Sequence, residues 1–457
     1  MVEADSGPKR PRDRALRARS VVVAAAAALA LASCGAVMPG GGGSSSGDGS
    51  QPTSASPAAA GKTVKVVFIG VDLDEVKKQT KLVTASVGDP KKQVEALEKW
   101  VNDNGGLGGR KLDAVFRMYD AQTDSPASEE KLCNQVAQDD KAFAVVLTGQ
   151  YQSNARPCYA QRKTLMLDAS LVSNDQALFD ELAPYLWSPS FPEYNAFTAS
   201  YIKALSQEKF FEGRKKVAIV AADTPVNRRT VGKKAVPQLK KLGIDAEVGW
   251  VDTTDIGTIY QGSEQAAITF ASAGIDRVMF LGGSRLASIF ATIAGSKQFK
   301  ATYAISSFDN PSFFLNNPDT VPADTMNGMV GIGFHPPQDV ADSEMPFPGE
   351  GVEKECLDIY EAAGITFETR EAARVALPYC DSVRMLKMGA DGVDGPLTAE
   401  AWSKAVDADG AGFQTASGFG NALGDGGHAA AGSYRVMRFA DDCNCFVYEG
   451  DDVPFSE

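Results

Sequence analysis

A strand–helix alternation that runs once and then starts again constrains the fold of this chain more than any other feature. The β-branched run TVKVVFIG at residues 63–70 predicts a buried strand, and apolar residues at helical spacing predict a helix over 91–102. The glycine-rich stretch 104–109 ends that helix. Further strands are predicted at 112–118, 142–147 and 164–167, with a helix that begins at Ser125-Pro126.

The second series begins at residue 216 and is followed by a different kind of tail. Its strands are predicted at 216–221, 246–251, 277–281 and 301–306, and its helices at 227–242, 260–273 and 284–293. Residues 433–439 and 445–448 are predicted to pair as a hairpin. Two such series predict an α/β fold of two doubly wound parallel-sheet lobes. Because parallel sheets bind ligands beyond the carboxyl ends of their strands, the natural site is the cleft between the lobes.

The start of the chain has the layout of a secretory signal. Six basic residues precede an apolar run of 12 residues at 21–32, which is too short to span a bilayer as a helix of about 20 residues. The run ends in Leu31-Ala32-Ser33-Cys34, which resembles the bacterial lipobox. Residues 1–33 would then be a lipoprotein signal peptide, and the Cys34 thiol would carry lipid at the outer face of the bacterial cytoplasmic membrane. The alternative is an ordinary signal peptide followed by an unrelated cysteine.

Residues 34–62 are almost entirely Gly, Ser, Pro, Ala, Gln and Thr, which predicts a flexible linker between the lipid and the lobes. Residues 1–33 hold six basic and three acidic residues, so their removal changes the net charge from −13 to −16. An acidic domain argues against nucleic acid as a partner and against adhesion to anionic lipid. A covalent anchor is therefore the expected route to the membrane.

Apart from Cys34, the chain has six cysteines, and an even number in an exported chain favours disulfides. Six cysteines allow 15 connectivities. Their neighbourhood in the sequence suggests Cys133–Cys158 and Cys356–Cys380, which leaves Cys443 and Cys445 to close a very tight ring with each other. A metal site at Cys443 and Cys445 is the weaker alternative, because no second pair of ligands lies nearby.

Several segments, in their order, resemble the periplasmic binding proteins of the leucine/isoleucine/valine type, also called type I solute-binding proteins. The resemblance covers roughly residues 63–450. It rests on WVNDNGGLGGRKLDAVFRMYD at 100–120, VMFLGGS at 278–284 and GGHAAAGSYRVMRF at 426–439. In addition, Cys133 and Cys158 flank the third strand, where members of the family often have a disulfide.

The resemblance implies a two-lobed monomer that closes on a small polar solute, such as an amino acid or a related compound, and delivers it to the permease of an ABC importer. Lobe 1 would comprise residues 63–190 and part of 331–457, and lobe 2 would comprise 191–330 and another part of 331–457. Three segments would cross between the lobes, at 187–195, at 327–335 and in the region after Val375.

In this family, the loops at the carboxyl ends of the strands contact the solute. The resemblance therefore implies the following contacts: Gln150, Tyr151, Gln152, Asp168, Ala169, Ser170, Asp223, Thr224, Asn227, Gly283, Ser284, Phe308 and Asp309. Helix N-termini among these loops suit a carboxylate, and Asp309 is the candidate partner for an ammonium group. Gln150-Tyr151-Gln152 replaces the small hydroxyl residues usual in amino-acid-binding members, which argues against a simple branched-chain amino acid.

Two other functions were weighed against the same observations. A lipid-anchored sensor that signals through a membrane partner without transport would have the same fold and anchor. A surface hydrolase is disfavoured because His335 and His428 are the only histidines and neither lies in a triad-like context. No P-loop or dinucleotide fingerprint is present, so the sequence predicts a protein that is not an enzyme and needs no cofactor or metal.

Overall fold

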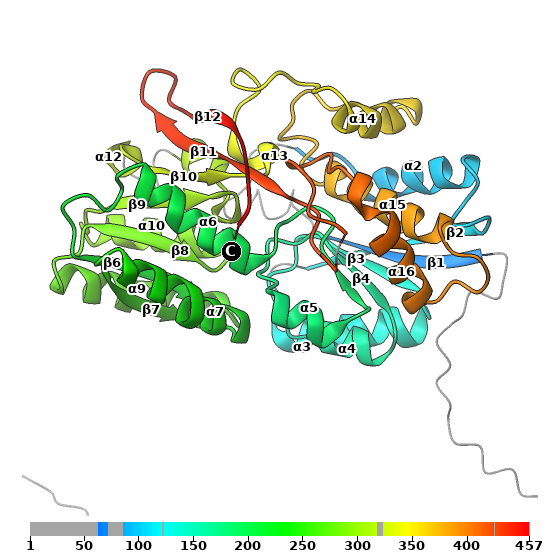
Figure 1. Ribbon diagram of the computed structural model, residues 1–457, viewed down its shortest axis with the longest axis horizontal. Helices are drawn as coiled ribbons and strands as arrows, with labels where there is room; N and C mark the ends of the chain where they lie inside the picture. The colour runs from blue at the N-terminus through cyan, green and yellow to red at the C-terminus, as the bar shows by residue number, and fades with distance from the viewer. Residues whose placement is uncertain (1–62, 72–85, 121–122, 318–322, 425, 457) are drawn as a thin grey trace, which may run out of the picture. The chain divides into compact units, whose positions relative to one another are not determined.

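The computed structural model describes residues 63–71, 86–120, 123–317, 323–424 and 426–456 (Figure 1). The predicted signal peptide, Cys34 and the linker lie outside the described residues, as does most of the loop that follows the first strand.

The first sheet has five parallel strands in the order β2-β1-β3-β4-β5. The strands are β1 (Thr63–Val71), β2 (Lys111–Tyr119), β3 (Ala144–Leu147), β4 (Leu165–Asp168) and β5 (Leu186–Trp187). The connecting helices are α2 (Pro90–Asp103), α3 (Pro126–Asn134), α4 (Arg156–Gln161) and α5 (Gln176–Leu182). Every residue of β3 and β4 is buried, as the continuous apolar runs in the sequence predict for central parallel strands.

The second sheet has seven strands in the order β12-β11-β10-β9-β8-β6-β7. They are β6 (Lys216–Ala222), β7 (Asp245–Val251), β8 (Arg277–Leu281), β9 (Thr302–Ser306), β10 (Val330–Gly333), β11 (Ser433–Ala440) and β12 (Cys445–Pro454). The parallel part, β7-β6-β8-β9-β10, repeats the strand order of the first sheet. The predicted hairpin is β11–β12, which extends this sheet because β11 runs antiparallel to β10. The two-lobed α/β fold is thus confirmed.

The helices of the second lobe follow the predicted order with one difference. They are α6 (Tyr194–Gln207), α7 (Pro225–Thr230), α8 (Val236–Lys241), α9 (Ile256–Ser272), α10 (Ser284–Ser296), α11 (Ser312–Asn316), α12 (Ala323–Met326) and α13 (Pro336–Asp339). The helix predicted over 227–242 is interrupted by a π turn at Val231–Ala235. Pro237 lacks an N–H and would clash with the preceding turn of a regular helix, and the π turn just before it relieves that conflict.

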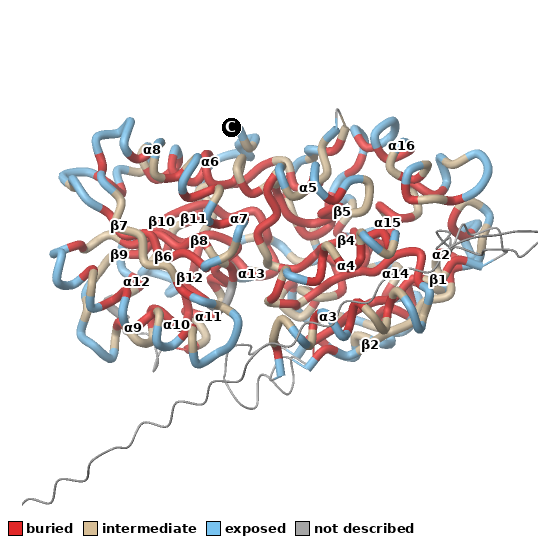
Figure 2. Tube along the Cα trace, turned by 90° about the horizontal axis from the view of Figure 1, so that it is seen from below, coloured by how far each residue is buried: buried red, intermediate tan, exposed pale blue. Residues whose placement is uncertain are grey.

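The chain returns to the first lobe after β10. Helices α14 (Val352–Ala362), α15 (Ala376–Asp391) and α16 (Ala399–Asp409) share one apolar core with α2 and β1. Trp187 and Trp402 meet edge to face in this core, with ring centroids 5.3 Å apart. Figure 2 shows the buried strands of both lobes, flanked by helices with exposed outer faces.

The three crossings between the lobes only partly match the predicted positions. The first runs from β5 to α6, within the predicted range 187–195. The range 327–335 is wrong for the second, because it contains the buried strand β10; the chain leaves the second lobe after α13. The third comes well after Val375, since α15 and α16 first cover the lobe 1 sheet and the chain re-enters the second sheet at Ser433. Ser188 and Ala429 bridge the first and third crossings.

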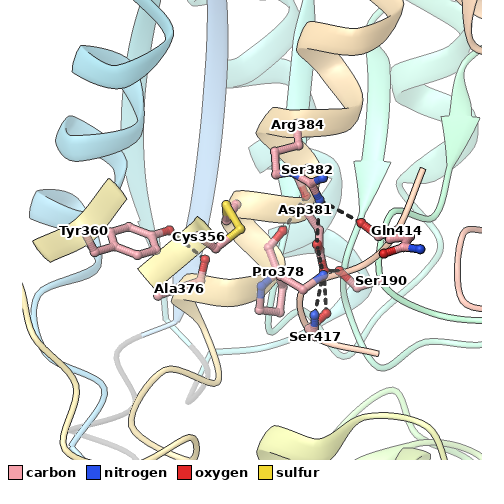
Figure 3. Close-up of a disulfide and its surroundings, with 12 residues drawn as sticks. Ser190, Cys356, Tyr360, Ala376, Pro378, Asp381, Ser382, Arg384, Gln414 and Ser417 are labelled. Atoms are coloured by element: carbon pink, nitrogen blue, oxygen red, sulfur yellow. Dashed lines mark hydrogen bonds and ion pairs between the residues drawn. A yellow bond between two sulfur atoms is a disulfide. The ribbon is translucent and has the colours of Figure 1, made fainter. Parts of the chain in front are cut away.

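A buried carboxylate on α15 binds two of these crossings (Figure 3). The Asp381 carboxylate accepts hydrogen bonds from Ser190 Oγ at 3.1 Å, Ser417 Oγ at 2.6 Å and Ala416 N at 2.5 Å. Burial raises the pKa of Asp381 to about 6. The adjacent Cys380 is joined to Cys356, so α15 is tied both to α14 and to the crossings.

The structure contains the three disulfides suggested by sequence neighbourhood. Cys133–Cys158 links α3 to α4, Cys356–Cys380 links α14 to α15, and Cys443–Cys445 lies in the turn between β11 and β12. Cys443 and Cys445 lie near Glu344, but their sulfurs are bonded to each other and offer no thiolate to a metal.

Candidate functional site

A small cavity lies between the two lobes, at the carboxyl ends of their strands. Its lining comes from both sheets: Tyr151, Gln152, Ser153, Leu171, Val172 and Ser173 from the first lobe, and Ala222, Thr224, Asn227, Thr253, Ile259, Gly282, Gly283 and Leu286 from the second. This is the position that parallel α/β sheets use for ligands.

The lobe 1 wall is held in place by a buried ion pair beneath it. Asp168, at the end of β4, pairs with Arg156 of α4 and also accepts hydrogen bonds from Ser170 Oγ at 2.5 Å and Asn174 Nδ2 at 2.9 Å. These contacts fix both ends of the segment 171–173, which lines the cavity. Asp168, Ala169 and Ser170 therefore support the wall but are not part of the lining.

The lobe 2 wall is formed where α7 and α10 begin. Thr224 caps α7 by accepting a hydrogen bond from Asn227 N at 3.2 Å, and Asn227 is only 2% exposed. No hydrogen-bond partner of Asn227 Oδ1 is found in the part of the chain that the structure describes. A buried amide oxygen without a partner is costly, so Asn227 is a candidate to accept a hydrogen bond from a solute.

Gly283, before α10, brings the second lobe against the first. Its φ of +89° is a conformation that other residues rarely adopt, and a Cβ atom there would lie 2.7 Å from the carbonyl oxygen of Leu171. A side chain at position 283 would therefore hold the two walls apart. The next residue, Ser284, begins α10, and its side chain lies outside what the structure describes.

The other predicted contacts lie away from the cavity lining. Asp223 forms an exposed ion pair with Arg228, with N–O distances of 2.5 and 2.7 Å. The Phe308 ring packs among other aromatic rings, with the centroid of Phe197 4.8 Å away. Gln150 is buried, and neither of its amide atoms has a partner among the described residues, yet it does not line the cavity.

Asp309 lies outside the cavity lining and is bonded to its own turn. Its carboxylate accepts hydrogen bonds from Ser306 N at 2.8 Å and Ser306 Oγ at 2.7 Å, which stabilises its own turn. Burial raises the pKa of Asp309 to about 8, so the protonated form is favoured at neutral pH. A protonated carboxyl group outside the lining is not the partner that an ammonium group needs.

Polar contacts between described residues cross from one lobe to the other beside the cavity. Gln152 Nε2 donates to the carbonyl oxygen of Thr253 at 3.0 Å and to Asp124 Oδ2 at 2.9 Å. Arg229 of α7 forms two hydrogen bonds to Asp175 at the start of α5. These contacts hold lining residues from the two lobes opposite each other.

The described lining combines neutral hydrogen-bonding groups with apolar side chains. Tyr151, Gln152, Ser173, Thr224 and Asn227 supply the former, and the apolar contribution comes from Leu171, Val172, Ala222, Ile259 and Leu286. Within this described lining there is no histidine, cysteine or carboxylate. The arrangement can bind a small molecule that has both polar groups and an apolar body.

Comparison with known proteins gives structural likeness without sequence likeness. No protein-family model matches the chain, and no curated protein matches its sequence. Among solved structures, a solute-binding protein of an ABC transporter from Rhodopseudomonas palustris BisB5, in complex with 3,4-dihydroxybenzoic acid, matches with a TM-score of 0.58 at 13% identity. The match covers 87% of this chain and 99% of that one.

Two further structures give the same result. A branched-chain amino acid ABC transporter protein from Thermus thermophilus with bound valine matches with a TM-score of 0.57 at 14% identity, over 86% of this chain and 96% of that one. An ABC transporter substrate-binding protein from Aeropyrum pernix matches with a TM-score of 0.59 at 16% identity, over the same shares of the two chains. The chain has the fold of the type I periplasmic solute-binding proteins.

The remaining lining residues of the cavity were not predicted from the sequence: Ser153, Leu171, Val172, Ser173, Ala222, Thr253, Ile259, Gly282 and Leu286. Thr253 follows a predicted strand, so the rule that selects loops at carboxyl ends could have found it. Ile259 and Leu286 lie inside helices, where the sequence does not show which face points to the cavity.

Proposed function

We propose that this protein is an exported, lipid-anchored solute-binding protein that captures a small solute between its lobes and delivers it to an ABC importer. The observation that carries the proposal is a cavity lined by loops from the carboxyl ends of both sheets. Three chain crossings connect the lobes, so relative rotation of the lobes would open and close this cavity. A protein that must take up and release a solute needs that motion.

The lining supports an amino acid or a related small acid as the solute. Structures of similar fold contain valine and 3,4-dihydroxybenzoic acid, each with an apolar body and polar groups. Here Leu171, Val172 and Leu286 would contact the body, and Asn227 Oδ1 would accept a hydrogen bond from the solute. The N-terminus of α10 would favour a carboxylate.

The anchor is proposed from the sequence alone. Cys34 follows a short apolar run, and residues 35–62 would separate the lipid from the lobes. Within the described ranges, no helix is long and apolar enough to cross a membrane. Replacing Cys34 by Ser should release the exported protein from the membrane fraction, and retention of Cys34→Ser at the membrane would contradict the anchor.

Binding is tested by a thermal-shift screen of amino acids, hydroxy acids and aromatic acids against the purified protein. A solute at 100 times its Kd should stabilise the fold by about 2.7 kcal/mol. Asn227→Ala should reduce this shift, whereas Gln265→Ala, which removes an exposed amide from α9 of the same lobe, should not. Equal loss in both variants would argue against the cavity as the site.

Delivery is tested separately from binding. Cells that lack the protein should lose uptake of the radiolabelled solute identified in the screen, and the wild-type chain should restore it. Normal uptake combined with a lost transcriptional response to that solute would instead establish a sensor. Turnover of the bound compound by the purified protein would show that it is an enzyme.

A further inference from the structure

One ion pair joins the two lobes beside the cavity. Arg229 Nε donates to Asp175 Oδ2 at 2.8 Å, and Arg229 Nη2 donates to Asp175 Oδ1 at 2.7 Å. Two parallel hydrogen bonds between a guanidinium and a carboxylate fix both distance and orientation. The pair therefore requires the starts of α5 and α7 to lie close together.

On the lobe 1 side, the carboxylate is held by its own helix as well as by the arginine. Asp175 is the N-cap of α5 and accepts a hydrogen bond from Leu178 N at 3.0 Å. Its side chain is 2% exposed, against 30% for Arg229. A buried carboxylate that lost its cation would need water in its place, so the pair favours the arrangement in which the lobes are together.

On the lobe 2 side, the guanidinium belongs to the helix that forms the cavity wall. Arg229 lies two residues after Asn227 on α7, and Asp175 lies two residues after Ser173 in the loop that follows β4. The π turn at Val231–Ala235 follows directly. Formation of the pair therefore brings Ser173 and Asn227 to opposite walls of the cavity.

We propose that Arg229 and Asp175 are positioning residues that set the equilibrium between the open and closed lobes. By holding the lobes closed, the pair places Ser173 and Asn227 where a solute between them can be bound by both. The contact from Gln152 to Thr253 O is between neutral groups and has weaker directional demands. The ion pair is therefore expected to make the larger contribution to closure.

A second ion pair on the same helix provides a matched control. The neighbouring Arg228 donates from Nε and Nη2 to Asp223, again with two hydrogen bonds, but both residues belong to the second lobe. The Arg228 and Asp223 side chains are 54% and 36% exposed. Removing this pair changes the charge of α7 in the same way without touching any contact between the lobes.

The test measures the distance between the lobes without a solute. Two exposed positions, Glu130 on α3 and Lys240 on α8, are replaced by a ketone-bearing residue and spin-labelled in the full chain, which leaves every cysteine unmodified. Pulsed electron-spin resonance then gives the distance distribution. Arg229→Gln and Asp175→Asn should each lower the ratio of closed to open molecules about fivefold or more, because each removes one charge of the pair. Arg228→Gln should give the wild-type distribution.

The double variant decides whether the two residues act as a pair. Asn keeps the capping ability of position 175, so Asp175→Asn should leave α5 folded. Asp175→Asn combined with Arg229→Gln should open the lobes no further than either single change, and Arg229→Lys should restore part of the closure. Additive effects, or a distribution in Arg229→Gln equal to that in Arg228→Gln, would overturn the proposal.

The inference rests on the proposed function only in assuming that the lobes close. Since no solute is present in the measurement, a protein that fails to deliver any solute can still show the effect of the Arg229–Asp175 pair on closure. Conversely, solute binding with an unchanged distance distribution in Arg229→Gln would contradict the role of the Arg229–Asp175 pair and leave the proposed function intact.

Discussion

The two sheets share one strand order, but the two lobes are stabilised in different ways. In lobe 1, two disulfides join helix pairs, and the ion pair of Arg156 with Asp168 lies fully inside the protein. In lobe 2, aromatic rings gather around Phe308, and the hairpin β11–β12 extends the sheet. The contrast teaches that one topology tolerates either covalent and charged links or aromatic packing as its main support.

The largest effect is expected from the buried ion pair of lobe 1. Asp168→Ala should lower the free energy of unfolding by about 3–5 kcal/mol, because Arg156 would remain buried without its carboxylate. Asp223→Ala, which breaks the exposed pair of lobe 2, should cost less than about 1 kcal/mol. Urea denaturation measures the loss in the free energy of unfolding of both variants. Similar losses would mean that burial does not distinguish the two ion pairs.

The disulfides should come next. Replacing Cys133 and Cys158 by Ser should cost about 3 kcal/mol, since the bond closes a loop with a sequence separation of 25. The same change at Cys443 and Cys445, whose separation is 2, should cost less. Hydrogen exchange in the first variant should rise in β3 and β4 while β8 and β9 stay protected; a uniform rise over both lobes would break the comparison.

Buried carboxyl groups in both lobes should make the stability depend on pH, and Glu129 is one such group in lobe 1. Burial raises the pKa of Glu129 on α3 from 4.5 to about 8. Since the folded-state pKa is raised, the contribution of Glu129 to the free energy of unfolding is full below about pH 4.5 and is lost as the pH rises through about 8.

Two variants test this loss of stability with rising pH. Glu129→Gln should flatten the decline in stability between pH 5 and pH 9 by about 2 kcal/mol, whereas the exposed neighbour change Glu130→Gln should not. Denaturation curves across this pH range measure the difference. An unchanged slope in Glu129→Gln would assign the proton uptake to other groups.

The smallest effect concerns the aromatic support of lobe 2. Phe308→Leu keeps most of the apolar volume but removes the edge-on contacts with Phe197 and Phe334, so it should cost about 1 kcal/mol. Phe143→Leu in the lobe 1 core, where no aromatic neighbour of Phe143 is found among the described residues, should cost less. Equal costs would mean that ring geometry adds nothing to packing in lobe 2.

Much of the fold follows from local patterns. The strand predicted at 277–281 is β8 residue for residue, because a buried apolar run between Asp276 and Gly282 has clear ends. The second crossing was misplaced because β10 is a short strand, VGIG, whose two glycines give it little apolar pattern. Which lobe a segment joins depends on distant partners, and periodicity carries no information about them.

The site was only partly predictable for the same reason. Tyr151, Gln152, Thr224, Asn227 and Gly283 line the cavity because they follow strands, and that rule depends on topology alone. The carboxylates do not follow it. Asp168 ends a strand and Asp223 follows one, but each is bound by an arginine, and Asp309 binds its own turn. Their contacts with a solute stay predictions that the structure does not favour.

Asp381 has a consequence for how the lobes can move. Its carboxylate holds Ser190 of the first crossing and Ser417 of the segment that leads to the third (Figure 3). Two segments bonded to one carboxylate should move together at that point, so the lobes are expected to turn about an axis that passes close to Asp381. Variants at Arg229 or Asp175 would then change how far the lobes open, while the direction of opening stays the same.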